Sequence, residues 1–113
     1  MRLVILESPY AGNRKTNMDY AYRAMVHSLS LGEAPFAAHL LYPQLLDDDN
    51  SEQRALGMAA GLEWLAKADA TVVYTDLGVS PGMSIGINRA ISLGKLVEYR
   101  SIGYIPELNN AGL

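Results

Sequence analysis

Two acidic residues directly follow short apolar runs of the chain, where they could do chemistry together. Glu7 follows the continuous apolar run at residues 3–6, and Asp76 follows the β-branched and aromatic run at residues 71–75. A pair of carboxylates at one site can bind sugar hydroxyls, or act as nucleophile and as general acid or base. The alternative is that each carboxylate caps a helix or faces solvent. Glu7 and Asp76 are therefore candidate catalytic residues, provided the fold brings them together.

A glycine-rich loop, residues 78–82 (Gly-Val-Ser-Pro-Gly), follows the second acid and precedes a predicted helix. Its backbone N–H groups and the Ser80 hydroxyl could hold a phosphate or a carboxylate at the helix N-terminus. We take Gly78, Ser80, Gly82 and Met83 as candidate binding residues, although Ser-Pro-Gly is also ordinary turn chemistry. The loop is neither a Walker A motif nor G-x-G-x-x-G, so the usual fingerprints of nucleotide hydrolysis and dinucleotide redox chemistry are missing.

Other polar and aromatic residues carry weaker signals. Tyr10 could stack on a base or simply pack within its loop. His39 lies near a predicted strand end and is a better site candidate than His27, but the two lack metal-ligand spacing. The acidic run at residues 47–49 is typical of a solvated loop. We therefore predict neither a metal nor a cofactor.

These residues must be positioned by alternating strands and helices. Apolar and β-branched runs predict strands at residues 3–6, 71–75 and 96–100, with a further short strand within residues 34–42. Apolar spacing of three and four predicts helices at residues 17–29, 51–67 and 84–93. An exposed loop at residues 43–50 is expected between the short strand within residues 34–42 and the helix at residues 51–67. Asn17 and Ser51 are the expected N-caps.

Strands that alternate with helices predict an α/β fold with a mainly parallel sheet covered on both faces. In such sheets, ligands bind at the carboxyl ends of the strands, near the point where the strand order reverses. If the strands at residues 3–6 and 71–75 are neighbours, the loops at residues 7–10 and 76–82 meet at one edge. The functional interpretation depends on that adjacency.

Composition narrows the class of protein further. The chain has 113 residues, half of them hydrophobic, which fits one folded domain spanning residues 1–113. A formal net charge of −3 offers no basic field for nucleic acid. The sequence has no Cys, no signal-peptide core and no apolar stretch long enough to span a membrane. We expect a soluble cytoplasmic protein whose partners include neither nucleic acid nor membrane.

Several motifs together resemble the nucleoside 2-deoxyribosyltransferase superfamily, in particular its small phage-type relatives. They are residues 7–10 (Glu-Ser-Pro-Tyr), residues 68–74 (Ala-Asp-Ala-Thr-Val-Val-Tyr), residues 80–82 (Ser-Pro-Gly) and a helix that ends with Ala90 and Gly94. The resemblance implies a flavodoxin-like three-layer sandwich with a sheet of four or five strands. It also implies a nucleoside or nucleoside 5′-monophosphate as ligand, and a homodimer or higher homo-oligomer.

By the same resemblance, Ser80 and Gly82 would touch a 5′-phosphate, while Ser8, Pro9 and Tyr10 would hold the base and sugar. Arg89 and Arg100 could add positive charge for the phosphate.

One position departs from the family pattern. The catalytic Glu of the family, which attacks the anomeric carbon, lies four residues after the Gly of its phosphate loop, and this chain has Gly86 there. The earlier helical Asp that the family often carries has no clear match either. Three hypotheses remain: Glu7, Asp76 or Glu98 replaces the missing acid and the N-glycosidic bond is cleaved or transferred; the domain binds a nucleotide-like molecule without cleaving it; or it is a structural or interaction protein.

Overall fold

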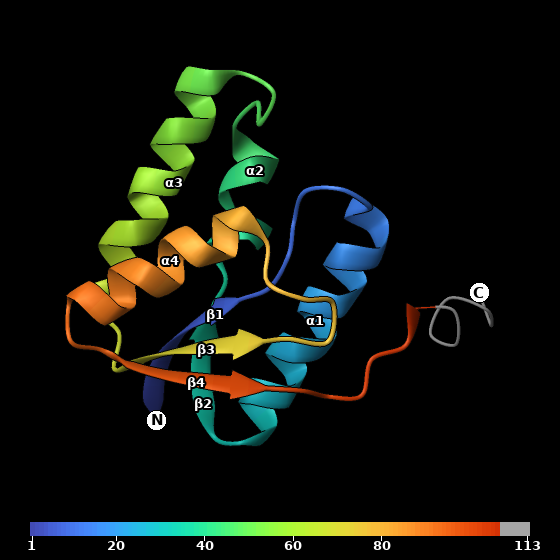
Figure 1. Ribbon diagram of the computed structural model, residues 1–113, viewed down its shortest axis with the longest axis vertical. Coiled ribbons are helices and arrows are strands. Elements are labelled where there is room, and N and C mark those ends of the chain that lie inside the picture. The colour runs from blue at the N-terminus through green and yellow to red at the C-terminus, as the bar shows by residue number, and fades with distance from the viewer. Residues whose placement is uncertain (107–113) are drawn as a thin grey trace.

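Four short strands form one sheet in which every neighbouring pair is parallel. The structure is a computed structural model that describes residues 1–106. The strands are β1 (Arg2–Glu7), β2 (Glu33–Phe36), β3 (Ala70–Tyr74) and β4 (Leu96–Arg100), in the order β2-β1-β3-β4 (Figure 1). This confirms the predicted α/β class and the parallel sheet.

The central pair of strands, β1 and β3, is the adjacency on which the functional interpretation depends. In their register Val4 pairs with Ala70 and Glu7 pairs with Val73, so both strands end at the same edge. The chain moves from β1 outward to β2 and then returns to add β3 on the other side. The strand order therefore reverses between β1 and β3, where parallel sheets bind ligands.

Helices cover both faces of the sheet, because successive side chains of a buried strand point to opposite sides. Val4 and Leu6 of β1 pack with Tyr20 of α1 (Arg14–Ser30) on one face. Ile5 points to the other face and packs with residues of α3 (Ser51–Leu65) and α4 (Pro81–Ser92), including Ala90. In Figure 1, α1 passes behind the strands, whereas α4 and the lower end of α3 lie above them in the view.

The helices begin at different residues from those predicted. Asn13, not Asn17, caps α1, because the Asn17 amide instead donates hydrogen bonds to the carbonyl groups of the preceding loop. Asn50, not Ser51, caps α3. Ser80 caps α4, which therefore starts three residues earlier than predicted. Each helix N-terminus is thus set by a side chain that already lies in the loop before it.

The segment after β2 is more structured than the predicted loop. It forms the short 3₁₀ helix η1 (Ala38–Leu40) and the helix α2 (Tyr42–Leu45). Gly61 lets α3 approach η1 closely, because a Cβ there would lie 2.9 Å from Ala38 Cβ.

Helix α3 is anchored mainly at its C-terminal end, where Leu65 is its single fully buried residue. The N-terminal part of α3 projects beyond the sheet together with α2, as Figure 1 shows. Within residues 1–106, no helix is both long and apolar enough to cross a membrane.

Candidate functional site

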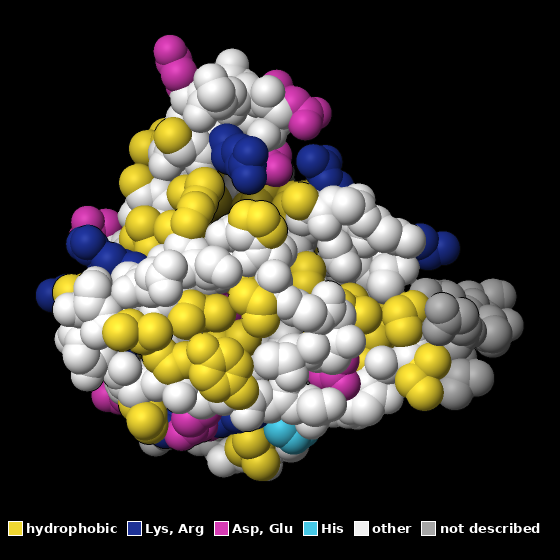
Figure 2. Space-filling view, viewed as in Figure 1, with side chains coloured by type: hydrophobic (Ala, Val, Ile, Leu, Met, Phe, Trp, Pro, Cys, Tyr) yellow, Lys and Arg dark blue, Asp and Glu magenta, His cyan; other side chains and the backbone are white. Residues whose placement is uncertain are grey.

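A cleft of about 270 Å³ lies between the projecting helix α3 and the N-terminal half of α4. The loop after β1 forms its floor, and η1 and α2 close its other side. Figure 2 shows the hollow beneath α3, with hydrophobic side chains gathered in it. It lies at the carboxyl end of β1, beside the point where the strand order reverses, and its volume is close to the lower end for small-molecule sites.

Glu7 lies in this cleft, where its carboxyl group has no partner among residues 1–106. It shares the α4 side of β1 with Ile5, and its carboxyl group rests on Gly86: a Cβ added at Gly86 would lie 2.9 Å from Glu7 Cδ. Among the described residues, no hydrogen bond or ion pair reaches the carboxylate. Burial without a compensating charge raises the pKa of Glu7 to about 8. The cleft thus holds a carboxyl group that is largely protonated at neutral pH and open to a ligand.

Asp76 has the opposite environment and does not line the cleft. Its carboxylate accepts hydrogen bonds from Tyr20 Oη at 2.6 Å, Ser101 Oγ at 2.7 Å and the backbone N–H groups of Ile102 and Tyr104. Although its partial burial acts to raise the pKa, these donors together hold the pKa of Asp76 far below its usual range. The structure therefore does not bring Asp76 together with Glu7. Asp76 instead links the end of β3 to the segment after β4 through these hydrogen bonds.

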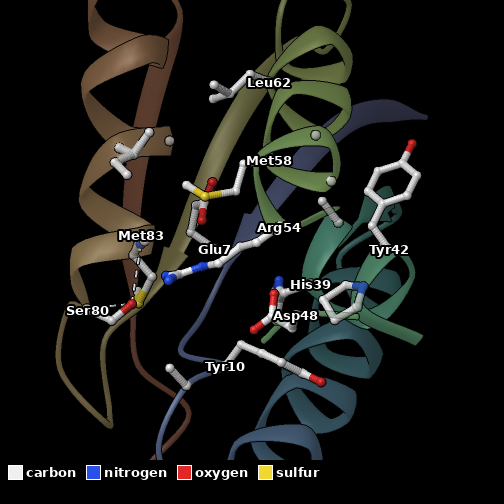
Figure 3. A pocket seen from close by; sticks show the side chains of 18 of the residues that line it. Glu7, Tyr10, His39, Tyr42, Asp48, Arg54, Met58, Leu62, Ser80 and Met83 are labelled. Carbon is white, nitrogen blue, oxygen red and sulfur yellow. Dashed lines mark hydrogen bonds between the residues drawn. The ribbon is translucent and has the colours of Figure 1, made fainter. Parts of the chain in front are cut away.

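Ser8, the residue after Glu7, forms a hydrogen-bonded pair with His39 of η1. Ser8 Oγ lies 2.7 Å from His39 Nε2, and both residues line the cleft. Burial lowers the pKa of His39 to about 4, so its imidazole is neutral at physiological pH. Figure 3 shows His39 toward the α2 side of the cleft and Glu7 between α4 and α3.

The N-terminus of α4 forms another part of the cleft wall, through Ser80, Gly82 and Met83. Ser80 Oγ accepts a hydrogen bond from Met83 N at 3.3 Å, which leaves the hydroxyl proton available to a ligand. Tyr10 also lines the cleft, whereas Gly78 and the buried Pro9 do not. Of the predicted binding residues, the structure gathers Ser8, Tyr10, Ser80, Gly82 and Met83 with Glu7.

Arg54 of α3 also lines the cleft, and the sequence interpretation missed it as a site residue. Its guanidinium forms no ion pair among the described residues, and Figure 3 shows it reaching from α3 toward the N-terminal end of α4. Arg89 and Arg100 are not cleft residues; Arg100 is bound to Glu33 and Glu98. The sequence around Arg54 carries no motif, so only the position of α3 beside α4 could identify it as a site residue.

No group of three or more metal-ligating side chains occurs within residues 1–106. On largely apolar walls, the cleft combines the unpaired carboxyl group of Glu7, the carboxylate of Asp48 that pairs with Arg14, the neutral imidazole of His39, the guanidinium of Arg54 and the N-terminus of α4. Such a site can hold an uncharged organic ring and an anionic group at the same time.

A family model places the chain among known sequences. The model described as a domain of unknown function, DUF7768, matches residues 2–100. The chain belongs to the DUF7768 family. A comparison with curated proteins gives no match.

Solved structures resemble this DUF7768 domain over most of its length. A 2-deoxyribosyltransferase from Bacillus psychrosaccharolyticus matches with a TM-score of 0.71 at 22% identity, over 91% of this chain and 75% of that one. A 2-desoxiribosyltransferase from Leishmania mexicana matches with a TM-score of 0.64 at 12% identity, over 99% and 72% of the two chains. The CMP N-glycosidase BcmB from Clostridium botulinum matches with a TM-score of 0.53 at 15% identity, over 98% and 80%. At these identities the likeness shows the fold, which is the one implied by the sequence resemblance.

Proposed function

We propose that this DUF7768 protein binds a nucleoside or a nucleoside 5′-monophosphate in the cleft and cleaves its N-glycosidic bond with Glu7. The fold is shared with two deoxyribosyltransferases and a CMP N-glycosidase. The cleft lies at the carboxyl end of β1, and Glu7 is its one carboxyl group with no partner among the described residues. A carboxylate at the anomeric carbon is the central requirement of glycosyl transfer through a covalent intermediate.

The observation that carries this proposal is the contact between Glu7 and Gly86. The resemblance implies a catalytic Glu at position 86, on α4, where this chain has Gly. The Glu7 carboxyl group occupies the space that a side chain at position 86 would enter. The carboxylate would then reach the same part of the cleft from a strand instead of a helix. This placement supports the proposal that Glu7 takes over the role of the missing Glu.

The rest of the cleft suits the other parts of such a substrate. The base and sugar would lie beside Ser8 and Tyr10, against the floor of the cleft. A 5′-phosphate would lie at the N-terminus of α4, where Ser80 and Gly82 offer donors and Arg54 approaches from α3. The ionised form of Glu7 would then attack the anomeric carbon, and its raised pKa makes the attack pH dependent.

Release of free base from a panel of deoxynucleosides and their 5′-monophosphates tests the proposal by chromatography. Glu7→Gln removes the ionisable nucleophile but keeps the shape, and we expect the rate to fall by about 10²- to 10⁴-fold. Glu63→Gln is the matched control, because Glu63 is exposed on α3 and does not line the cleft. If ligands raise the melting temperature but no base appears, the protein is a binder; if neither occurs, it is a scaffold.

The homo-oligomer implied by the resemblance is part of the same proposal. Exposed apolar side chains cover α4 and the edge strand β4, among them Ile91 and Tyr99, each 60% exposed (Figure 2). A second copy could cover this surface. Light scattering of the purified protein tests this proposal, because a homo-oligomer would have a multiple of the mass of one chain.

A further inference from the structure

Glu7 and His39 are titratable side chains that line the cleft from different elements, and of these two the proposed function uses only Glu7. Glu7 approaches from β1 against α4, whereas His39 belongs to η1 on the α2 side (Figure 3). A sugar whose anomeric carbon faces Glu7 would direct its base away from α4, toward the floor at Ser8 and Tyr10. His39 lies at that end of the cleft.

The hydrogen bond to Ser8 fixes which nitrogen of His39 is free. Nε2 is engaged with Ser8 Oγ at 2.7 Å, and no partner for Nδ1 occurs among the described residues. Within residues 1–106, Thr71 Oγ1 is the one side-chain polar atom that is buried without a partner, so Nδ1 is not sealed from the cleft. When Ser8 donates its O–H proton to Nε2, the single proton of a neutral imidazole resides on Nδ1.

We propose, on the basis of the proposed function, that His39 assists departure of the base by donating a hydrogen bond from Nδ1–H, and that Ser8 positions it. In this step a Glu7 oxygen forms a bond to C1′ while the C1′–N bond breaks and its electron pair passes to the base. The anionic base accepts the Nδ1–H hydrogen bond as its charge develops, and then takes a proton from water. Water later hydrolyses the Glu7 ester, which releases the sugar and regenerates the carboxyl group. His39 itself neither gains nor loses a proton.

The surroundings of His39 support a neutral donor. Burial of the ring keeps its pKa near 4, so it does not become imidazolium at neutral pH. The other titratable or charged side chains that line the cleft are Tyr10, Tyr42, Asp48 and Arg54. Asp48 pairs with Arg14, and its Oδ2 lies 3.7 Å from Arg14 Nη2. A neutral imidazole in an apolar cleft is a preorganised donor, and its hydrogen bond to the departing base becomes stronger as negative charge develops on the base.

The leaving group of the substrate tests this role. A natural base departs as a strongly basic anion, whereas p-nitrophenolate departs without assistance. We expect His39→Phe to slow base release from a deoxynucleoside or its 5′-monophosphate about 100-fold, but to slow release of p-nitrophenol from the matching p-nitrophenyl deoxyriboside less than threefold. His39→Gln, which keeps an N–H donor, should recover part of the rate with the natural base. Glu7→Gln should slow both substrates.

Three outcomes separate the inference from the function on which it rests. Selective loss with the natural base in His39→Phe supports the role of His39, and Ser8→Ala should show a weaker form of the same pattern. Equal loss with both substrates, or no loss, overturns it and leaves the action of Glu7 intact. If the wild-type protein cleaves neither substrate, the proposed function fails and this inference fails with it. Melting curves of each variant exclude unfolding as the cause.

Discussion

Glu7 and Asp76 are the same kind of residue in the same kind of place, yet the structure treats them in opposite ways. Glu7 is the last residue of β1, Asp76 lies two residues after the end of β3, and the two parallel strands are neighbours. Glu7 has no hydrogen-bond partner among the described residues, and burial raises its pKa to about 8. Asp76 accepts hydrogen bonds from four residues, and its pKa lies far below the ordinary value.

The difference comes from the layer that covers each strand end. Glu7 points to the α4 side, where Gly86 leaves room for a carboxyl group but offers it no donor. Asp76 meets Tyr20 of α1 and the segment that follows β4, which both provide donors. A carboxylate with satisfied hydrogen bonds stabilises a fold, whereas an unpaired one destabilises it and is retained for another reason. The comparison therefore shows that Asp76 is part of the hydrogen-bonded framework, and it supports the proposal that Glu7 acts on a ligand.

Replacement of Asp76 gives the largest expected change in stability. Asp76→Asn leaves donors from Tyr20, Ser101 and the backbone without a charged acceptor, and we expect a loss of about 3 kcal/mol in the free energy of unfolding. Urea denaturation followed by circular dichroism measures this loss. Glu7→Gln should leave stability unchanged or increased, because it removes an unpaired acid.

The contrast between the two carboxylates predicts a large loss of stability for Asp76→Asn and none for Glu7→Gln. If both substitutions lower the free energy of unfolding equally, Glu7 has a structural partner and the two residues do not differ in role.

The pH dependence of stability is the next largest effect. The pKa of Glu7 rises on folding from 4.5 to about 8, so the folded state holds an extra proton between these values and its stability falls as pH rises. The pKa of His39 falls from 6.5 to about 4, which gives the opposite slope and offsets Glu7 up to pH 6.5. Between pH 6.5 and 8 Glu7 acts alone, and we expect a loss of about 2 kcal/mol.

Urea denaturation at pH 6.5 and pH 8 measures this loss, with Glu7→Gln as the control that should remove it. Asp76 contributes in a separate window: its pKa is lowered from 3.8, so its stabilisation is present above that pH and disappears in acid. A wild-type stability that stays level from pH 6.5 to 8 would contradict the burial of an unpaired Glu7.

Arg54→Ala has the smallest expected effect. It tests whether the proposed phosphate position at the N-terminus of α4 is separate from the part of the cleft that holds Glu7. We expect about a fivefold loss of affinity for a deoxynucleoside 5′-monophosphate, and little change for the deoxynucleoside, because one exposed cation contributes about 1 kcal/mol. Fluorescence of Trp64 can report binding, since its Nε1 donates to Tyr42 Oη and Tyr42 lines the cleft. Equal losses for both ligands would contradict a phosphate role for Arg54.

Much of the fold was predictable because it depends on local patterns. The β4 strand coincides with the predicted residues 96–100, and the alternation of strands and helices predicted the parallel sheet. The pairing of β1 with β3 was a condition of the sequence interpretation, and only the structure shows it. Helix N-termini were less predictable, since several residues near each start can act as caps. Asn17 has the chemistry of a cap, but its amide is engaged with the preceding loop. The choice between such residues depends on tertiary contacts.

The site was predictable only where it lies on the loops after strands. Glu7, Ser8, Tyr10 and Ser80 line the cleft, as strand-end positions in parallel sheets commonly do. Arg54 escaped notice because it belongs to α3, whose position relative to α4 is a long-range property of the fold. The separate environments of Glu7 and Asp76 could not be predicted either, because each depends on residues distant in the sequence.

An exchange of the two positions that meet in the cleft is the most direct test of the account. Glu7→Ala should abolish base release, and Gly86→Glu should also impair it, because the new side chain collides with Glu7. In the double variant that space is vacant, so a carboxylate from α4 can take the place of the one from β1. We predict that the double variant releases base measurably faster than either single variant. If all three are equally inactive while folded, the carboxylate at this place in the cleft is not what breaks the bond.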